Sequence, residues 1–145
     1  MTDAPPLARD AAIPIVKQND TGHQRHIGYV IEIFPDRTEA RLTPDENHMN
    51  RQDVLHGGIV ATILDAALGY ACSRHLAEDA GIAVVTVSLT VNFIAATQAA
   101  AVIATGRVTG GGYKTVFAEG EVKTVDGLLL ATATGVFKRG KPKRD

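Results

Sequence analysis

One acidic residue lies in the middle of the most apolar stretch of the chain. Asp65 is the only charged residue between positions 57 and 73. On a helix, its neighbours three and four residues away would all be uncharged: Ala61, Thr62, Leu68 and Gly69. Burying an unpaired carboxylate costs several kcal/mol, so proteins rarely place one there without a role. We therefore take Asp65 as a candidate general base or nucleophile. The alternative is that it lies in solvent at a helix edge, or pairs with Arg74 or Arg107.

A His-Gly-Gly sequence, residues 56–58, lies where a polar loop meets the same apolar stretch. The first four N–H groups of a helix have no partner within the helix and lie at the positive end of its dipole. Glycine has no Cβ, so a carbonyl of another molecule can approach these groups closely. We therefore predict that the Gly57 N–H holds a developing oxyanion. The simpler alternative is that residues 56–58 only form a tight turn into the helix.

The separation of these two features points to a second chain. Eight helical residues rise about 12 Å, so Asp65 cannot reach a carbonyl that is held by Gly57 of its own helix. If both groups act on one bond, each must come from a different subunit. The sequence therefore predicts a site shared across a two-fold dimer, with two helices side by side.

The elements that must position these residues are one helix and several strands. Apolar residues recur at helical spacing over 57–74, and the stretch is apolar on all sides, which indicates a buried helix. Strict alternation of apolar and polar residues over 85–93 is typical of a strand. The other predicted strands are 26–33, 38–42, 100–109, 113–124 and 128–138. This order indicates an α+β architecture in which the helix covers the apolar face of an antiparallel sheet.

The composition fits one small globular domain. The chain has 145 residues, of which 45% are apolar and 5% aromatic, with no Trp. A core built from Val, Ile, Leu and Ala is thin for a free monomer and favours oligomerisation. We divide the chain into a partly ordered N-terminal arm over 1–24, a domain over 25–138 and a basic tail over 139–145.

The charge and the single cysteine exclude several classes of protein. A formal net charge of −1 gives no global field that would attract nucleic acid. Cys72 is the only cysteine, which excludes an internal disulfide and suits a reducing compartment. The first residues lack the apolar core of a secretory signal, and no charge-free apolar stretch is long enough to span a bilayer. We therefore expect a cytoplasmic protein that binds neither nucleic acid nor a membrane.

The sequence His48-Met49-Asn50, followed by residues 55–65, closely resembles the signature of PaaI-type hotdog thioesterases, which belong to the 4-hydroxybenzoyl-CoA thioesterase superfamily. The resemblance extends over about residues 28–138. It implies a hotdog fold, in which a long helix is wrapped by a curved antiparallel sheet. It also implies a dimer with joined sheets, usually paired into a homotetramer, and an activity on acyl-CoA such as that of phenylacetate degradation.

The resemblance implies a role for each matching residue. Asp65 would be the base or nucleophile, and the Gly57 N–H would be the oxyanion donor. Asn50 and His56 would position the thioester or the water, and Thr86 would assist the carboxylate. The residues that we expect to bind the substrate on the same helix are Gly58, Ala61, Leu68 and Gly69.

The position of Thr86 conflicts with the alternation of its strand. Thr86 belongs to the polar face of the strand, whereas Val85 and Val87 are predicted to pack on the helix. A β-bulge or the partner subunit would be needed to bring Thr86 to Asp65. Otherwise it is an ordinary exposed threonine. We interpret His48 as a loop residue near the mouth of the site.

Other functions fit the sequence less well. A zinc site would need more converging ligands than Cys72 and five scattered histidines provide. We expect no metal and no cofactor, since coenzyme A is part of the substrate. A hotdog hydratase or dehydratase would place a His base opposite a carboxylate, whereas His56 is followed directly by two glycines. A non-catalytic acyl-CoA-binding module stays a further alternative. The basic tail either contacts the phosphates of coenzyme A or lies free in solvent.

Overall fold

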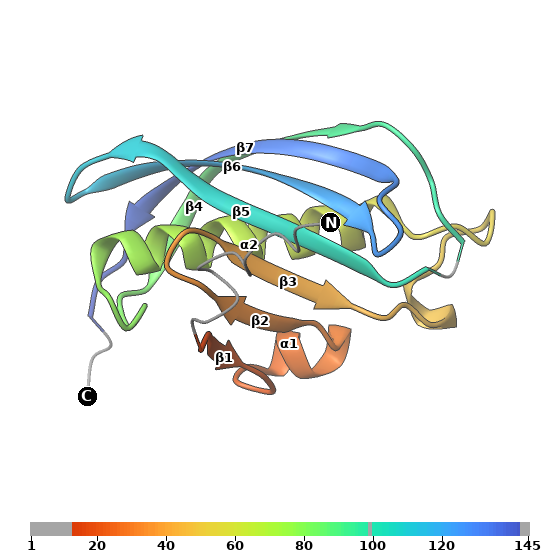
Figure 1. Cartoon of the computed structure of the whole chain (residues 1–145), viewed down its shortest axis with the longest axis horizontal. Coiled ribbons are helices and arrows are strands. Elements are labelled where there is room, and N and C mark those ends of the chain that lie inside the picture. The colour runs from red at the N-terminus through yellow and green to blue at the C-terminus, as the bar shows by residue number, and fades with distance from the viewer. Residues whose placement is uncertain (1–12, 99, 143–145) are drawn as a thin grey trace, which may run out of the picture.

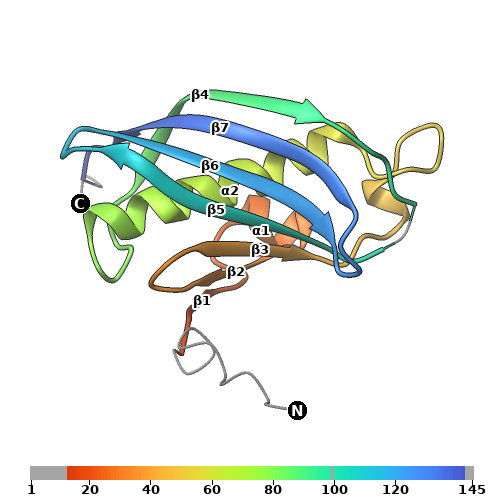
Figure 2. The same ribbon diagram turned by 45° about the horizontal axis from the view of Figure 1, so that its top comes forward.

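A long helix, α2, lies on the concave face of a seven-stranded antiparallel sheet (Figure 1). The structure is a computed structural model and describes residues 13–98 and 100–142. Along the chain the elements are β1 (Ile15–Lys17), α1 (Gly22–Ile27), β2 (Val30–Ile33), β3 (Thr38–Leu42), the 3-10 turn η2 (Glu46–His48), α2 (Gly57–Leu76), β4 (Val84–Phe93), β5 (Val102–Gly111), β6 (Thr115–Thr124) and β7 (Leu129–Arg139). The strand order is β1-β2-β3-β5-β6-β7-β4, so β1 and β4 form the two edges of the sheet (Figure 2).

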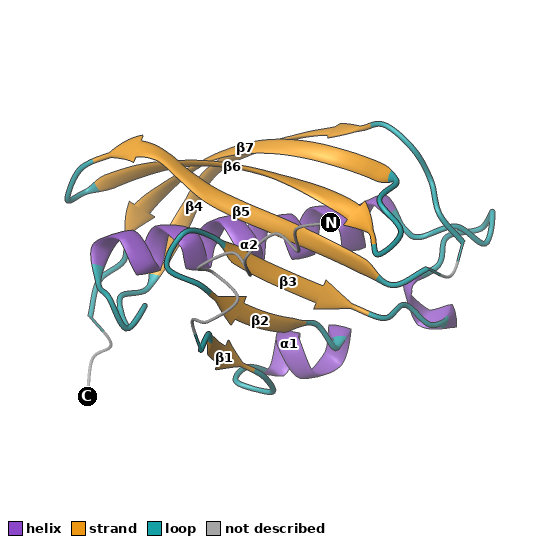
Figure 3. Cartoon of the chain, viewed as in Figure 1, coloured by secondary structure: helices purple, strands orange, loops and turns teal. Residues whose placement is uncertain are grey.

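The side of α2 that faces the sheet is packed so closely that two strand positions have no room for a side chain. A Cβ on Gly106 of β5 would lie 2.7 Å from the carbonyl oxygen of Ala67, and one on Gly120 of β6 would lie 2.6 Å from Leu68 Cδ1. Leu64 and Leu68 are fully buried there. The predicted α+β architecture, with a long helix wrapped by a curved antiparallel sheet, is thus confirmed (Figure 3).

The first predicted strand, 26–33, is wrong in its first half. The chain forms α1 (Gly22–Ile27) there, and β2 begins only at Val30. The Thr21 side chain caps the start of α1 by accepting a hydrogen bond from the Gln24 N–H at 3.1 Å. Gly28 ends the helix with a φ of 94°, in the left-handed region that favours glycine. These capping signals outweigh the strand propensity of the following β-branched residues.

The segment before residue 25 is part of the sheet and not only an arm. β1 pairs with β2 in antiparallel register, and the predicted boundary at 25 falls inside α1. Gln24 is buried and ties the segment together, because its side-chain amide donates to the carbonyl oxygens of Lys17 at 2.7 Å and Tyr29 at 3.1 Å. Residues 1–12 of the predicted arm lie outside the described residues.

The remaining strands lie close to their predicted ranges. β3 to β7 each begin and end within two residues of the prediction. Arg139, assigned to the basic tail, is the last residue of β7, and 143–145 lie outside the described residues. Among the described helices, none is both long and apolar enough to cross a membrane.

A β-bulge between Thr86 and Ser88 changes which side chains of β4 face the helix. Because side chains alternate along a strand, one extra residue moves every residue on one side of it to the opposite face. Thr86 pairs with the buried Phe137 of β7 and therefore points inward. Val85 and Val87 are 59% and 62% exposed, so the prediction that they pack on the helix is wrong. The bulge that was needed to turn Thr86 inward is present.

Candidate active site

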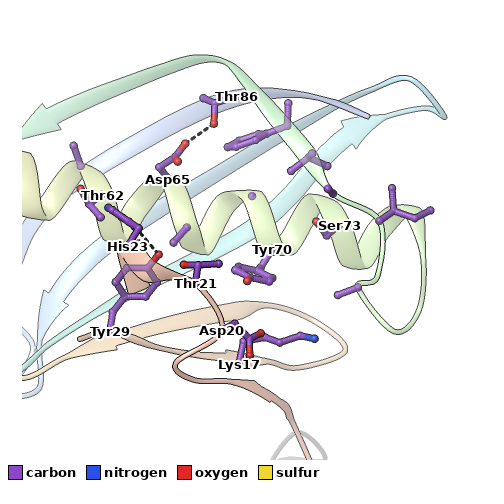
Figure 4. A pocket seen from close by; sticks show the side chains of 18 of the residues that line it. Lys17, Asp20, Thr21, His23, Tyr29, Thr62, Asp65, Tyr70, Ser73 and Thr86 are labelled. Carbon is purple, nitrogen blue, oxygen red and sulfur yellow. Dashed lines mark hydrogen bonds between the residues drawn. The ribbon is translucent and has the colours of Figure 1, made fainter. Parts of the chain in front are cut away.

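The bulge in β4 brings the Thr86 hydroxyl to the Asp65 carboxylate. Thr86 Oγ1 donates a hydrogen bond of 2.7 Å to Asp65 Oδ1, across the space between β4 and α2 (Figure 4). Asp65 is half-buried and forms no ion pair within the described part of the chain. The alternative that Asp65 forms an ion pair with Arg74 or Arg107 is therefore not found. One carboxylate oxygen is held by Thr86, and the carboxylate keeps acceptor capacity for a water or for another group.

Asp65 and Thr86 line an open cavity of about 780 Å³ that runs along α2. Three of the four predicted substrate-binding residues also line it: Gly58, Ala61 and Gly69. Leu68 does not, because it is fully buried against the sheet. Successive helical residues are about 100° apart, so Leu68 lies about 60° around α2 from Asp65, far enough for its side chain to turn into the sheet. The prediction that Leu68 contacts the substrate is corrected, and Leu68 is a core residue.

The start of α2 is capped by His56, which leaves the Gly57 N–H free. The Gly58 N–H donates to His56 Nδ1 at 2.8 Å, and the His56 carbonyl accepts from the N–H groups of Ile59 and Val60. An Nδ1 that accepts carries no proton, so in the neutral ring Nε2 carries it. Among the described residues the Gly57 N–H has no hydrogen-bond partner. His56 therefore forms the turn into the helix, and the same turn provides an unpaired donor.

The strand β4 passes near both Asp65 and Gly57 of its own chain. Thr86, near its start, contacts Asp65, and Phe93, its last residue, lies over Gly57, where an added Cβ would be 3.2 Å from the ring. Gly57 and Asp65 are eight residues apart on α2, as predicted. The helical rise keeps them about 12 Å apart within one chain.

Asn50 and His48 stabilise the loop before α2 and do not line the cavity. Asn50 Oδ1 accepts hydrogen bonds from the N–H groups of Gln52 at 2.9 Å and Val54 at 3.3 Å. His48 is buried, and its Nε2 lies 2.7 Å from the Ile27 carbonyl oxygen. The interpretation of His48 as a residue at the mouth of the site is wrong. Its ring joins the loop to the end of α1, which fixes the path of the chain towards His56.

The sequence reasoning missed one wall of the cavity, which comes from the segment before β2. Tyr29 lies there, and its hydroxyl is 3.2 Å from His23 Nδ1 (Figure 4). Burial raises the pKa of Tyr29, and the nearby Tyr70 and Asp65 raise it further. The caps at Thr21 and Gly28 are the sequence signal that would have placed α1, and with it this wall, against the long helix.

The single cysteine takes no part in the site. Cys72 is fully buried in α2, and burial raises the pKa of its thiol to about 12. A thiol with such a pKa is protonated at neutral pH and is a poor nucleophile. Asp65 is the one carboxylate that α2 presents to the cavity.

Comparison with known proteins gives a family match. A profile of the thioesterase superfamily matches residues 52–131, which is more than half of the chain. The matched stretch contains Gly57, Asp65 and Thr86, whereas Asn50 lies just before it. A search of curated proteins gave no match of comparable significance.

Solved structures agree with this match. A thioesterase family protein from Silicibacter pomeroyi is 28% identical, with a TM-score of 0.73 over 82% of this chain and 89% of that protein. A Bacillus halodurans protein solved with CoA is 26% identical, with a TM-score of 0.77 over 88% and 83%. The E. coli PaaI protein, from the phenylacetic acid degradation operon, shares the fold at 21% identity, with a TM-score of 0.75 over 86% and 88%. The long helix wrapped by an antiparallel sheet and the profile match together show that this chain belongs to the thioesterase superfamily and has its hotdog fold.

Proposed function

We propose that the protein hydrolyses an acyl-CoA thioester, with an aryl or a short- to medium-chain acyl group, to the free acid and coenzyme A. The observation that carries this proposal is the Asp65 carboxylate on the wall of an open cavity, held by the Thr86 hydroxyl at 2.7 Å. Membership of the thioesterase superfamily supports the type of reaction. The Bacillus halodurans relative that was solved with CoA supports coenzyme A as the leaving thiol.

In the proposed mechanism, each site takes one group from each of two subunits. The Gly57 N–H of one subunit donates to the thioester carbonyl oxygen and stabilises the negative charge that forms there. Asp65 of the partner subunit either attacks the carbonyl carbon or takes a proton from an attacking water. The C–S bond then breaks, and coenzyme A leaves as a thiolate. If Asp65 attacks, water then hydrolyses the Asp65 anhydride to the free acid and supplies the proton for the thiolate. If Asp65 acts as a base, the proton that it took from the water passes to the thiolate. The reaction needs no metal and no cofactor beyond the coenzyme A of the substrate.

The neighbouring side chains would orient these two groups. The Thr86 hydroxyl donates to Oδ1 of Asp65, which directs Oδ2 towards the substrate or the water. His56 holds the first turn of α2, so that the Gly57 N–H points away from the helix. Asn50 would act from the loop that it stabilises, on the thioester or the water bound at the site of the partner subunit.

The dimer that this mechanism requires is supported by the free edge of β4. β4 is an outer strand, and it exposes three large apolar side chains, Val85, Val87 and Phe93, each by more than half. An exposed apolar edge strand favours pairing with another strand. We propose that two copies of β4 pair and join the sheets, and that two such dimers form a homotetramer. Analytical ultracentrifugation of the purified protein measures this directly.

Two further expectations go with the activity. An aryl substrate would connect the protein to phenylacetate degradation, which phenylacetyl-CoA tests. The buried, unpaired Cys72 suits a reducing compartment, so we propose that the protein works in the cytoplasm.

The decisive experiment compares Asp65→Asn with the wild-type protein. Release of free thiol from aryl, short-chain and medium-chain acyl-CoAs gives kcat and KM for each. We expect kcat of Asp65→Asn to fall by about 10³-fold, because the amide can neither attack nor accept a proton. The change is nearly isosteric, so the melting temperature should stay close to that of the wild type.

Asp126→Asn is the matched control, since Asp126 is exposed in the turn between β6 and β7. Turnover of Asp65→Asn at the level of this control would remove Asp65 from the mechanism. Tight binding of acyl-CoA by the wild type without any thiol release would indicate a binding module. Hydration of crotonyl-CoA without thiol release would indicate a hydratase.

A further inference from the structure

The Tyr29 hydroxyl and the His23 ring form a polar pair on the wall of the cavity that lies opposite α2. Tyr29 Oη is 3.2 Å from His23 Nδ1, and the two rings meet edge to face with their centres 5.8 Å apart. Tyr29 is 7% exposed, whereas His23 is exposed. Gly28, which ends α1, and the Thr21 cap fix the backbone on either side of His23. The pair is therefore held by the fold and not by its own contact alone.

This pair faces the same space as the proposed catalytic carboxylate. Tyr29, His23 and Asp65 all line the cavity of about 780 Å³. Burial raises the pKa of Tyr29, and the nearby Tyr70 and Asp65 raise it further, which agrees with a position on the same cavity. A substrate whose thioester carbonyl lies at Asp65 therefore shares this cavity with the Tyr29 hydroxyl.

The α2 wall of the cavity has three small side chains beside the hydroxyl-bearing Thr62, Tyr70 and Ser73. Ala61, Ala66 and Gly69 leave the space open, and none of them offers a side-chain hydrogen bond. An acyl group that lies along these three residues meets apolar surface there, and the Tyr29 hydroxyl lines the opposite wall. A polar group of the acyl chain that faces this opposite wall would have Tyr29 as its partner, and a hydrocarbon there would leave Tyr29 bound to His23 alone.

The hydrogen-bonding capacity of the pair selects the kind of polar group. If His23 Nδ1 carries a proton, it donates to Tyr29 Oη, and the phenol O–H is free to donate into the cavity. If Nδ1 is unprotonated, the phenol donates to it, and the phenol oxygen is free to accept. A substrate hydroxyl can both donate and accept, so it matches the pair in either tautomer. A carbonyl or an ammonium group matches only one of them.

We propose that Tyr29, oriented by His23, is a specificity-determining residue that hydrogen-bonds a hydroxyl group on the acyl part of the substrate. This inference rests on the proposed thioesterase function of the same cavity. It assigns the acyl end of the site to the segment between β1 and β2, and the thioester end to α2 and β4.

The test uses pairs of acyl-CoAs that differ by one terminal hydroxyl, namely butanoyl with 4-hydroxybutanoyl and hexanoyl with 6-hydroxyhexanoyl. The measured quantity is the ratio of kcat/KM for the hydroxylated compound to that for the plain one. We expect the wild type to have a ratio above 1 for at least one pair, and Tyr29→Phe to lower that ratio at least tenfold, through KM. His23→Phe, which removes the orienting nitrogen, should lower it about threefold to fivefold.

Tyr113→Phe is the matched control, because Tyr113 is 68% exposed and does not line the cavity. A wild-type ratio of 1 or less for every pair overturns the inference, as does a Tyr29→Phe ratio equal to that of Tyr113→Phe. The proposed thioesterase function fails separately, if the wild type hydrolyses neither these four compounds nor an aryl acyl-CoA. In that case calorimetric binding of the thioether analogues of the same pairs decides the inference, with the ratio of Kd values in place of kcat/KM.

Discussion

The sheet side and the cavity side of α2 carry similar residue types but meet different surroundings. On the sheet side, Leu64 and Leu68 are fully buried, and the strands opposite have glycines because no side chain fits there. On the cavity side, Asp65 and Gly69 are half-buried beside an open space. The helix is apolar all round because one side packs on the sheet, while the other lines a cavity with small side chains.

This contrast predicts that the sheet side of α2 determines stability and that its cavity side determines activity. Protein interiors are close-packed, so a change on the sheet side alters the free energy of unfolding. A change on the cavity side removes few contacts and alters binding or turnover. Three substitutions test the separation, in addition to those described above.

Leu68→Ala should have the largest effect on stability. Leu68 Cδ atoms contact the strand backbones near Gly120 and Gly135, where the sheet and the helix have no space to collapse. Removing a buried leucine side chain costs about 2–5 kcal/mol, and a site that cannot collapse lies at the upper end. Urea denaturation followed by circular dichroism measures this loss.

Leu128→Ala is the matched control, since Leu128 is 49% exposed, and we expect it to change the free energy of unfolding by about 0.5 kcal/mol or less. The assignment of Leu68 to the sheet side of α2 is contradicted if Leu68→Ala keeps wild-type stability but loses acyl-CoA turnover. That result would return Leu68 to the substrate pocket.

Thr86→Val should have a smaller effect than Leu68→Ala, and the effect should be on turnover and not on stability. The substitution keeps the shape of the side chain and removes the hydroxyl that donates to Asp65. A hydrogen bond to a charged group contributes about 1.5–3 kcal/mol, so kcat should fall between about tenfold and a hundredfold. Thr90→Val, on the outer face of the same strand, is the control and should keep wild-type turnover. Equal kcat values for the two variants would show that the Thr86 hydroxyl does not orient the carboxylate.

The parts of the fold that repeat a simple period were predictable from the sequence. The helix at 57–74 and the strand at 85–93 were found because each shows its period over many residues. The face assignment of β4 failed upstream of its bulge, because the alternation of Val85, Thr86 and Val87 is unbroken in the sequence. A bulge is a property of pairing with the neighbouring strand, and it leaves no mark in the pattern of one strand.

The site was predictable only where chemistry and local geometry coincide. Asp65 and Gly57 were found because a charge in an apolar helix and a glycine at a helix start are visible without tertiary contacts. Tyr29 was missed because its place on the cavity wall depends on α1, a helix of six residues defined by its caps. Leu68 was misplaced, since an all-apolar helix does not reveal which of its sides meets the sheet.

Gly69→Ala should have the smallest effect, and it should stabilise the fold. A Cβ at Gly69 would lie 3.5 Å from Phe137 and 3.8 Å from Val84, which is ordinary van der Waals contact. Alanine favours the helical conformation over glycine by about 1 kcal/mol, so the free energy of unfolding should rise by roughly 0.5–1 kcal/mol. The added methyl group narrows the cavity, so KM should rise more for hexanoyl-CoA than for butanoyl-CoA.

Gly106→Ala, the matched change on the sheet side, places a Cβ 2.7 Å from the Ala67 carbonyl oxygen and should destabilise the protein. If both variants changed the free energy of unfolding by the same amount and in the same direction, the two sides of α2 would not differ in packing. That result would contradict an open cavity beside Asp65.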